Sequence, residues 1–209
     1  MKILKYTFYI ILGLLFFWLV ILRLIAKFSS GSPCPFALSK VVDNPLRHKY
    51  ILPALERVGI QKGEHILELG PGPGAFTLLA AQKAGEEGKI TAVDIQPKMI
   101  AALQEKLETA GVKNVETRVA SAFSLPLEDA SVDRAFLITV LPEVPDQQKA
   151  LKELHRVLKP GGILSISEEF LDPDYPLAGS TIRRVEACGF KLDQRFGNWF
   201  MYTLNFKKV

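Results

Sequence analysis

From His65 onward, short apolar runs alternate with segments of helical periodicity, and no other feature constrains the fold as strongly. This alternation is typical of a parallel sheet covered by helices. The last two apolar runs are joined by a short turn suited to a hairpin, which predicts an antiparallel C-terminal strand. Strands are predicted at 65–69, 89–94, 115–120, 132–138, 162–167, 190–195 and 199–206, and helices near 75–84, 97–110, 145–158 and 178–188.

A glycine-rich turn follows the first predicted strand. The strand HILEL runs into Gly70, Pro71, Gly72, Pro73 and Gly74, immediately before a predicted helix. Glycines let the backbone turn sharply and let a ligand approach where a Cβ would collide, and the helix N-terminus presents free N–H groups. A tight turn without a ligand is the alternative. The strand-to-helix context favours a ligand site.

An acidic residue, Asp94, ends the second predicted strand twenty residues after Gly74. A carboxylate at this position can accept hydrogen bonds from the two ribose hydroxyls of a nucleoside. On this geometry alone NAD and S-adenosylmethionine are hard to separate. The spacing G-P-G-P-G differs from G-x-G-x-x-G, and the chain lacks the Tyr-x-x-x-Lys pair of a short-chain dehydrogenase. Both details favour S-adenosylmethionine.

Four motifs in order resemble class I S-adenosylmethionine-dependent methyltransferases, particularly the group with ubiquinone and menaquinone, sterol and phospholipid methyltransferases. They are ELGPGPG at 68–74, DI at 94–95, LPLEDASVD at 125–133 and HRVLKPGG at 155–162. The resemblance covers about residues 45–207. It implies an α/β fold, with a Rossmann-like, seven-stranded, mostly parallel sheet, helices on both faces and an antiparallel C-terminal strand.

The resemblance also implies a cofactor site. The glycine loop would lie along the methionine part, with Glu68 holding its amino group and Ile95 beside adenine. Ser121 stands where family members often carry Asp, so weaker cofactor binding is expected. The expected cofactor-binding residues are Glu68, Gly70, Pro71, Gly72, Gly74, Asp94, Ile95, Ser121, Ala122, Phe123, Thr139 and Tyr50.

The sequence does not identify a catalytic residue. Methyl transfer from a sulfonium is an in-line displacement, so positioning can supply much of the acceleration, whereas carbon and phenol acceptors usually need a base. His48 and Tyr50 precede the first strand, where this family often forms a lid; His65 is expected to be structural, and His155 lies in a helix away from the strand ends. The candidate bases near strand ends, each also readable as a cap, loop or surface group, are Glu143, Glu168, Glu169, Asp172, Asp174 and Tyr175.

The chain opens with an apolar stretch. Residues 6–22 carry no charge, and with residues 24–26 beyond Arg23 the stretch approaches the ~20 residues needed to cross a bilayer. A cleaved signal peptide is the alternative, but residues 28–33 offer no small-x-small cleavage site. We therefore expect an N-terminal anchor at 1–27, either transmembrane or lying in one leaflet, a linker and juxtamembrane helix at 28–44, and the methyltransferase domain at 45–209.

Charge and cysteine content limit the kinds of partner that the chain can have. The net charge of +4 comes from the first 27 residues, because the rest balances 22 bases against 22 acids. No nucleic-acid partner is expected, since phosphate binding requires a concentrated basic face. Cys34 and Cys188 are too few for a disulfide framework or a metal site. The basic residues Lys40, Arg47, His48 and Lys49 can meet anionic headgroups or form an ordinary solvated helix face.

These observations predict a membrane-anchored methyltransferase that acts on a lipid or another membrane-associated hydrophobic acceptor. Methylation of small hydrophobic thiols, phenols or amines is an alternative, and a noncatalytic cofactor-binding or scaffold protein is another. The bilayer and a hydrophobic substrate are the expected partners, and a monomer is expected. The more basic flank follows the apolar stretch, and the cofactor is made in the cytosol. The catalytic domain is therefore expected there.

Overall fold

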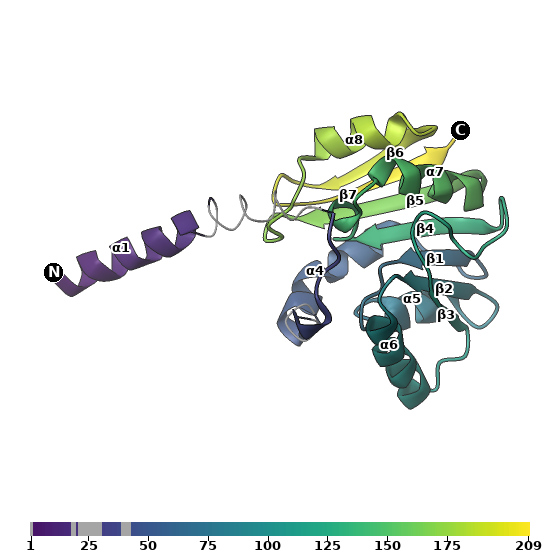
Figure 1. Cartoon of the computed structure of the whole chain (residues 1–209), viewed down its shortest axis with the longest axis horizontal. Helices are drawn as coiled ribbons and strands as arrows, with labels where there is room; N and C mark the ends of the chain where they lie inside the picture. The colour runs from purple at the N-terminus through teal and green to yellow at the C-terminus, as the bar shows by residue number, and fades with distance from the viewer. Residues whose placement is uncertain (1, 18–19, 21–30, 39–42) are drawn as a thin grey trace.

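The computed structural model of the chain describes residues 2–17, 20, 31–38 and 43–209 (Figure 1). Seven strands form one sheet in the order β3-β2-β1-β4-β5-β7-β6. Their bounds are β1 His65–Leu69, β2 Lys89–Asp94, β3 Val115–Val119, β4 Val132–Ile138, β5 Leu158–Glu169, β6 Phe190–Gly197 and β7 Met201–Lys208. The helices are α1 Lys2–Phe16, α4 Pro45–Val58, α5 Thr77–Ala84, α6 Pro97–Ala110, α7 Gln147–Val157 and α8 Ala178–Glu186, with 3₁₀ turns η2 Phe36–Leu38 and η3 Leu141–Glu143.

The sheet is mostly parallel, as predicted. Strands β1 to β5 pair in parallel, while β7 is antiparallel to both of its neighbours, β5 and β6. The antiparallel C-terminal strand therefore lies inside the sheet, and β6 forms the edge. β5 begins at Leu158, four residues before the predicted start, because Leu158 pairs with Val132 ahead of an irregularity in the β4 register.

Helices cover both faces of the sheet, and each face has its own apolar core. On one face α4 and α5 pack against buried strand residues such as Ile66 and Phe136, and α6 packs beside them on Ala92. On the other face α7 and α8 cover Leu164 and its neighbours. The alternation of side chains along each strand produces this division, since successive residues point to opposite faces.

α4 begins at an N-cap and continues through an internal proline. The side chain of Asn44 accepts a hydrogen bond from the backbone N–H of Arg47 at 3.0 Å, as expected of an N-cap. The helix runs through Pro53 without interruption. Pro53 itself is exposed, while Ala54 and Leu55 are fully buried against the sheet and hold the helix in place.

The apolar N-terminal stretch is described only in part. Within the described residues, no helix is both long enough and apolar enough to cross a membrane, so the expected transmembrane helix is not supported. Residues 18–19 and 21–27 of the expected anchor lie outside the described residues, as do residues 39–42 of the predicted juxtamembrane helix. The described part of α1 is apolar and exposed, with Tyr6 at 68% and Leu14 at 65%.

Candidate functional site

The carboxyl ends of the parallel strands, at Leu69, Asp94, Ile138 and Glu169, meet at one end of the sheet, which we call its carboxyl end. Ligand sites of open α/β sheets lie outside this end. The loops, turns and helix starts that gather there come from distant parts of the sequence. They form the region around the glycine loop, Glu68 and Asp94, which we call the cofactor pocket, together with a covering segment and a cluster of carboxylates.

The glycine loop after β1 needs glycine for more than one reason. Gly70, Gly72 and Gly74 all have positive φ, a conformation that other residues rarely adopt. A Cβ on Gly70 would lie 2.6 Å from Val140, and one on Gly74 would lie 2.6 Å from Leu103, so both also permit close packing. A Cβ on Gly72 would meet no atom within 4 Å. The backbone at Gly72 is therefore open to a ligand.

Glu68 lies beneath this loop and is 2% exposed. Its Oε2 has no hydrogen-bond partner among the described residues. Burial raises the pKa of Glu68 to about 8, and the nearby Asp94 raises it further. A buried carboxylate without a partner is costly unless a cation or a proton satisfies it. The ammonium group of an amino-acid ligand fits this requirement.

Asp94 ends β2 beside the glycine loop, as the sequence predicts. Its Oδ2 accepts a hydrogen bond from the backbone N–H of Gly72 at 3.2 Å, and its Oδ1 accepts one from Gln96 at 2.8 Å. Burial nevertheless raises the pKa of Asp94. The next residue, Ile95, is 55% exposed and leaves an apolar surface beside the carboxylate. An acid next to an exposed apolar side chain suits a ribose joined to a flat base.

Ser121, Ala122 and Phe123 follow β3, and the structure brings their loop beside Asp94. The backbone N–H of Ala120 donates to the carbonyl oxygen of Asp94 at 3.1 Å. The hydroxyl of Ser121 accepts a hydrogen bond from the N–H of Phe123 at 3.2 Å, so it already stabilises its own turn. Contact of these three residues with adenine stays a prediction.

Arg47 joins α4 to the ends of β4 and β5. Its guanidinium donates to Oε1 of Glu169 at 2.9 Å and to the hydroxyl of Thr139 at 3.1 Å. Thr139 has φ +56°, unusual for a β-branched residue and typical of strained functional sites. The sequence grouped Arg47 with headgroup-facing basic residues. That interpretation is wrong for Arg47, because its charge is held by Glu169, which is 3% exposed.

The segment before α4 crosses the carboxyl end of the sheet. The backbone N–H of Cys34 donates to Glu143 at 2.9 Å, and the carbonyl of Cys34 accepts from the side chain of Gln96 at 2.9 Å. Asp43 forms an ion pair with Lys106 at 2.7 Å. The described parts of residues 31–50, which we call the covering segment, thus bond to loops on both sides of the glycine turn.

Tyr50, at the end of the covering segment, lies near Glu169 and the hairpin between β6 and β7. Its ring meets Phe200 edge-on at 6.1 Å, and its buried hydroxyl has no partner among the described residues. Burial and the charge of Glu169 raise its pKa. Tyr50 therefore stays a candidate for ligand contact. The side chain of His48 lies outside the described residues.

A cluster of carboxylates lies beside the cofactor pocket. Burial raises the pKa of Glu143 to about 8 and that of Asp172 to about 7, and it raises the pKa of the fully enclosed Glu168 well above its ordinary value. Asp172 and Asp174 raise the pKa of both glutamates through their charges. Neither oxygen of Glu168 has a hydrogen-bond partner among the described residues. Glu143 and Asp172 can therefore hold or release protons near neutral pH.

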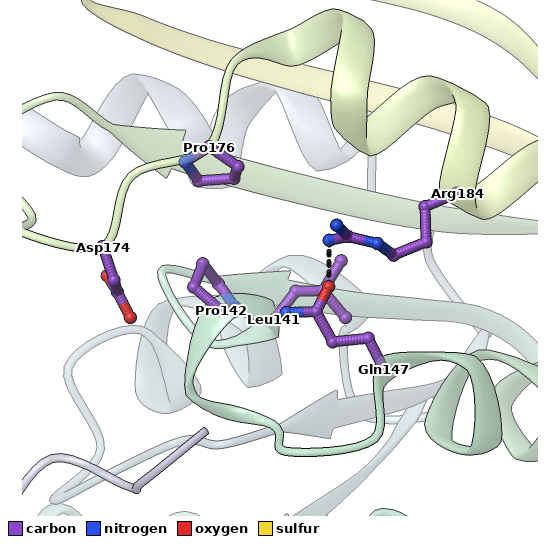
Figure 2. A pocket seen from close by; sticks show the side chains of 6 residues that line it. All are labelled: Leu141, Pro142, Gln147, Asp174, Pro176 and Arg184. Atoms are coloured by element: carbon purple, nitrogen blue, oxygen red, sulfur yellow. Dashed lines mark hydrogen bonds between the residues drawn. The ribbon is translucent and has the colours of Figure 1, made fainter. Parts of the chain in front are cut away.

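A cavity of about 210 Å³ opens among η3, the loop after β5 and α8 (Figure 2). Asp174 and Pro176 line one side, and Pro142 lines the other. The guanidinium of Arg184 donates to the side chain of Gln147 across the cavity. The cavity therefore lies on the α7 and α8 face, next to the carboxylate cluster.

His65, His155 and Tyr175 make contacts within the fold. His65 bonds to the carbonyl of Ser131 at 3.0 Å and to Thr91 at 2.9 Å, so its structural interpretation is supported. His155 meets Phe190 edge-on in the α7 and α8 layer. The hydroxyl of Tyr175 donates to the carbonyl of Trp199. No group of three or more potential metal ligands occurs in the part of the chain that the structure describes.

A glycine loop over a buried glutamate, with an aspartate at the end of the adjacent strand, defines a nucleoside-binding α/β domain. A family model described as a methyltransferase domain matches residues 60–191. The chain belongs to this methyltransferase family. It is thus an enzyme domain whose cofactor is S-adenosylmethionine, as the sequence motifs implied.

Known relatives support the same class. Demethylmenaquinone methyltransferase of Listeria welshimeri is 32% identical over 138 residues, which cover 66% of this chain and 58% of the relative. Arsenite methyltransferase of Halobacterium salinarum is 35% identical over 114 residues, covering 54% of this chain and 29% of that protein. The chain therefore spans less than two thirds of the length of these relatives.

The fold matches solved structures as well. The crystal structure of a SAM-dependent methyltransferase from Aquifex aeolicus superposes with a TM-score of 0.79 at 25% identity, covering 84% of this chain and all of that one. A putative sarcosine dimethylglycine methyltransferase from Galdieria sulphuraria gives a TM-score of 0.66 at 19% identity, covering 78% of this chain and 85% of that one. The second match shows the fold alone.

Proposed function

We propose that the chain transfers the methyl group of S-adenosylmethionine to a hydrophobic acceptor that is dissolved in a membrane or held at its surface. The observation that carries the proposal is the placement of the buried carboxylate cluster beside the cofactor pocket. Gly31, five positions after the apolar stretch in the sequence, bonds to Pro142 at the same end of the domain. The names of the demethylmenaquinone methyltransferases favour a quinone-type acceptor.

Each residue of the cofactor pocket has a distinct task in this proposal. Glu68 pairs with the ammonium group, and Asp94 accepts hydrogen bonds from the ribose hydroxyls. The open backbone at Gly72 allows the ligand to approach the loop. When bound, the cofactor supplies an electrophilic methyl group. The protein then has to orient the acceptor in line with this group and exclude water.

The covering segment excludes water from the site of methyl transfer. Arg47 fastens it to Glu169 and Thr139, and Cys34 fastens it to Glu143. Glu143, whose pKa is raised by burial to about 8, can take the proton that a phenol or an activated carbon acceptor must lose. A raised pKa matches such a task, because a group that titrates near neutral pH both accepts and releases protons.

The acceptor can be identified with labelled cofactor. The protein is incubated with radiolabelled S-adenosylmethionine and total membrane lipids, and in parallel with a panel of small thiols, phenols and amines. We expect label in the lipid fraction. If label appears only in the small acceptors, the acceptor is a small molecule and not a lipid. Cofactor binding by calorimetry without transfer to either set would instead indicate a noncatalytic binding protein.

A further inference from the structure

Two loops at the carboxyl end of the sheet expose large apolar side chains. Leu171 and Leu177, in the loop between β5 and α8, are 47% and 72% exposed, and Trp199, in the turn between β6 and β7, is 68% exposed. Figure 1 shows both loops at the same end of the sheet. We call Leu171, Leu177 and Trp199 the apolar rim.

The two loops are fastened together, so the rim is one unit. The backbone N–H of Phe170 donates to the carbonyl of Phe200 at 2.7 Å. The ring of Phe170 meets the rings of Trp199 at 5.3 Å and Tyr175 at 5.8 Å, both edge-on. Trp199 thus stays largely exposed even though an aromatic cluster supports it. Exposure of an apolar side chain to water costs free energy, and the aromatic support keeps Trp199 in this exposed position.

Gly31, the first described residue after the apolar stretch, bonds to the domain next to this rim. The backbone N–H of Gly31 donates to the carbonyl of Pro142 at 3.3 Å. Pro142 lines the same cavity as Pro176, the residue before Leu177 (Figure 2). Gly31 stands only five positions after Ala26, the last residue of the apolar stretch in the sequence.

We propose that the apolar rim docks on a lipid bilayer, so that the cofactor pocket and the carboxylate cluster face the membrane. This inference rests on the proposed function, because it gives a bilayer-dissolved acceptor a direct path to the site. Tryptophan at the rim suits this partner, since its ring prefers the membrane–water interface. The apolar stretch that precedes Gly31 in the sequence favours a bilayer over a second copy of the chain.

Fluorescence tests the docking directly, because the chain has two tryptophans. In the Trp18→Phe variant of the full chain, Trp199 is the sole reporter. We expect its emission to shift to shorter wavelength and fall at least twofold with phosphatidylcholine and phosphatidylglycerol vesicles whose lipids carry bromine near the headgroups. Unchanged emission, or failure of the chain to bind these vesicles, would overturn the proposal. A blue shift without vesicles that grows with protein concentration would also overturn it, in favour of self-association.

A matched control places the reporter at the opposite end of the sheet. Val209 is 74% exposed and follows β7, whose eight residues span roughly 25 Å. In Trp18→Phe/Trp199→Phe/Val209→Trp, emission should be insensitive to brominated lipid, and quenching equal to that of Trp199 would contradict the orientation. Calorimetric cofactor binding and methyl transfer are measured on the same samples. Quenching without lipid methylation would contradict the proposed lipid acceptor but support the proposed docking on a bilayer.

Discussion

At the scale of single residues, Asp94 should carry much of the affinity for the nucleoside. Asp94→Ala removes a charged hydrogen-bond acceptor and is expected to weaken cofactor binding by roughly 1–3 kcal/mol. It also removes the bonds to Gly72 and Gln96 that hold the loop. Calorimetric titration with S-adenosylmethionine measures the change, with Asp193→Ala, an exposed residue of β6, as the control. Parent-like affinity in Asp94→Ala would mean that the nucleoside binds elsewhere.

Glu68 should make cofactor affinity depend on pH. Its pKa is about 8 because of burial, so at lower pH the carboxyl is neutral and must lose its proton to pair with an ammonium group. Below about pH 8, cofactor affinity should therefore rise with pH, by at most roughly tenfold per pH unit. Glu68→Gln should bind more weakly and lose most of this dependence. A parent with pH-independent affinity between pH 6 and 8 would contradict the pairing.

At the scale of elements, Arg47 should decide whether α4 and the covering segment stay closed. Arg47→Gln leaves Glu169 buried and unpaired, which is expected to cost about 3–5 kcal/mol or to open the segment. Hydrogen exchange across residues 43–58 and chemical denaturation measure the two outcomes. The control is Lys83→Gln, which breaks an exposed pair with Glu56 and should cost about 1 kcal/mol or less. Equal effects of the two variants would refute the role of Arg47.

Local sequence patterns predicted some elements and site residues but not the contacts between distant ones. Strands 89–94 and 132–138 were predicted with their observed bounds, since their apolar runs are bounded by polar turns and each strand is a local feature. Glu68 and Asp94 were placed correctly beside the glycine loop because a motif fixes their positions, while their contacts with the cofactor stay predictions. The roles of Arg47 and Cys34 were missed, because their partners Glu169 and Glu143 lie more than one hundred positions away. No local pattern encodes such contacts.

At the scale of the whole molecule, stability should depend on pH in an unusual direction. The pKa values of Glu68 and Glu143 are about 8 and that of Asp172 is about 7, so the folded state binds more protons than the unfolded chain between about pH 4 and pH 8. The free energy of unfolding should therefore fall as pH rises through this window. Thermal denaturation of the cofactor-free protein from pH 5 to 8.5 measures the trend.

Amide variants identify the groups responsible. Glu143→Gln should flatten the pH dependence, because an amide does not titrate. Glu128→Gln, which changes a carboxylate in the loop before β4, should leave it unchanged. A melting temperature of the parent that rises steadily from pH 5 to 8.5 would show that these carboxylates are ionised in the folded state.

The orientation of the whole chain can be tested by proteolysis. We propose that the methyltransferase domain lies in the cytosol, where the cofactor is made. Protease added to intact cells should leave the domain uncut, and opening the membrane should allow digestion. Digestion before opening would place the domain outside the cell and separate it from its cofactor. Sealed vesicles of the reverse polarity provide the control, because they should expose the domain at once.

The position of β7 in the sheet has a consequence for synthesis. β7 lies between β5 and β6, yet the ribosome makes it after both of them. Until β7 emerges, β5 lacks its antiparallel neighbour and β6 has no partner in the sheet. A nascent chain halted before Met201 should therefore expose unpaired strand and the apolar surface that Tyr202, Leu204 and Phe206 would cover. Such a chain would depend on chaperones until its final strand is released.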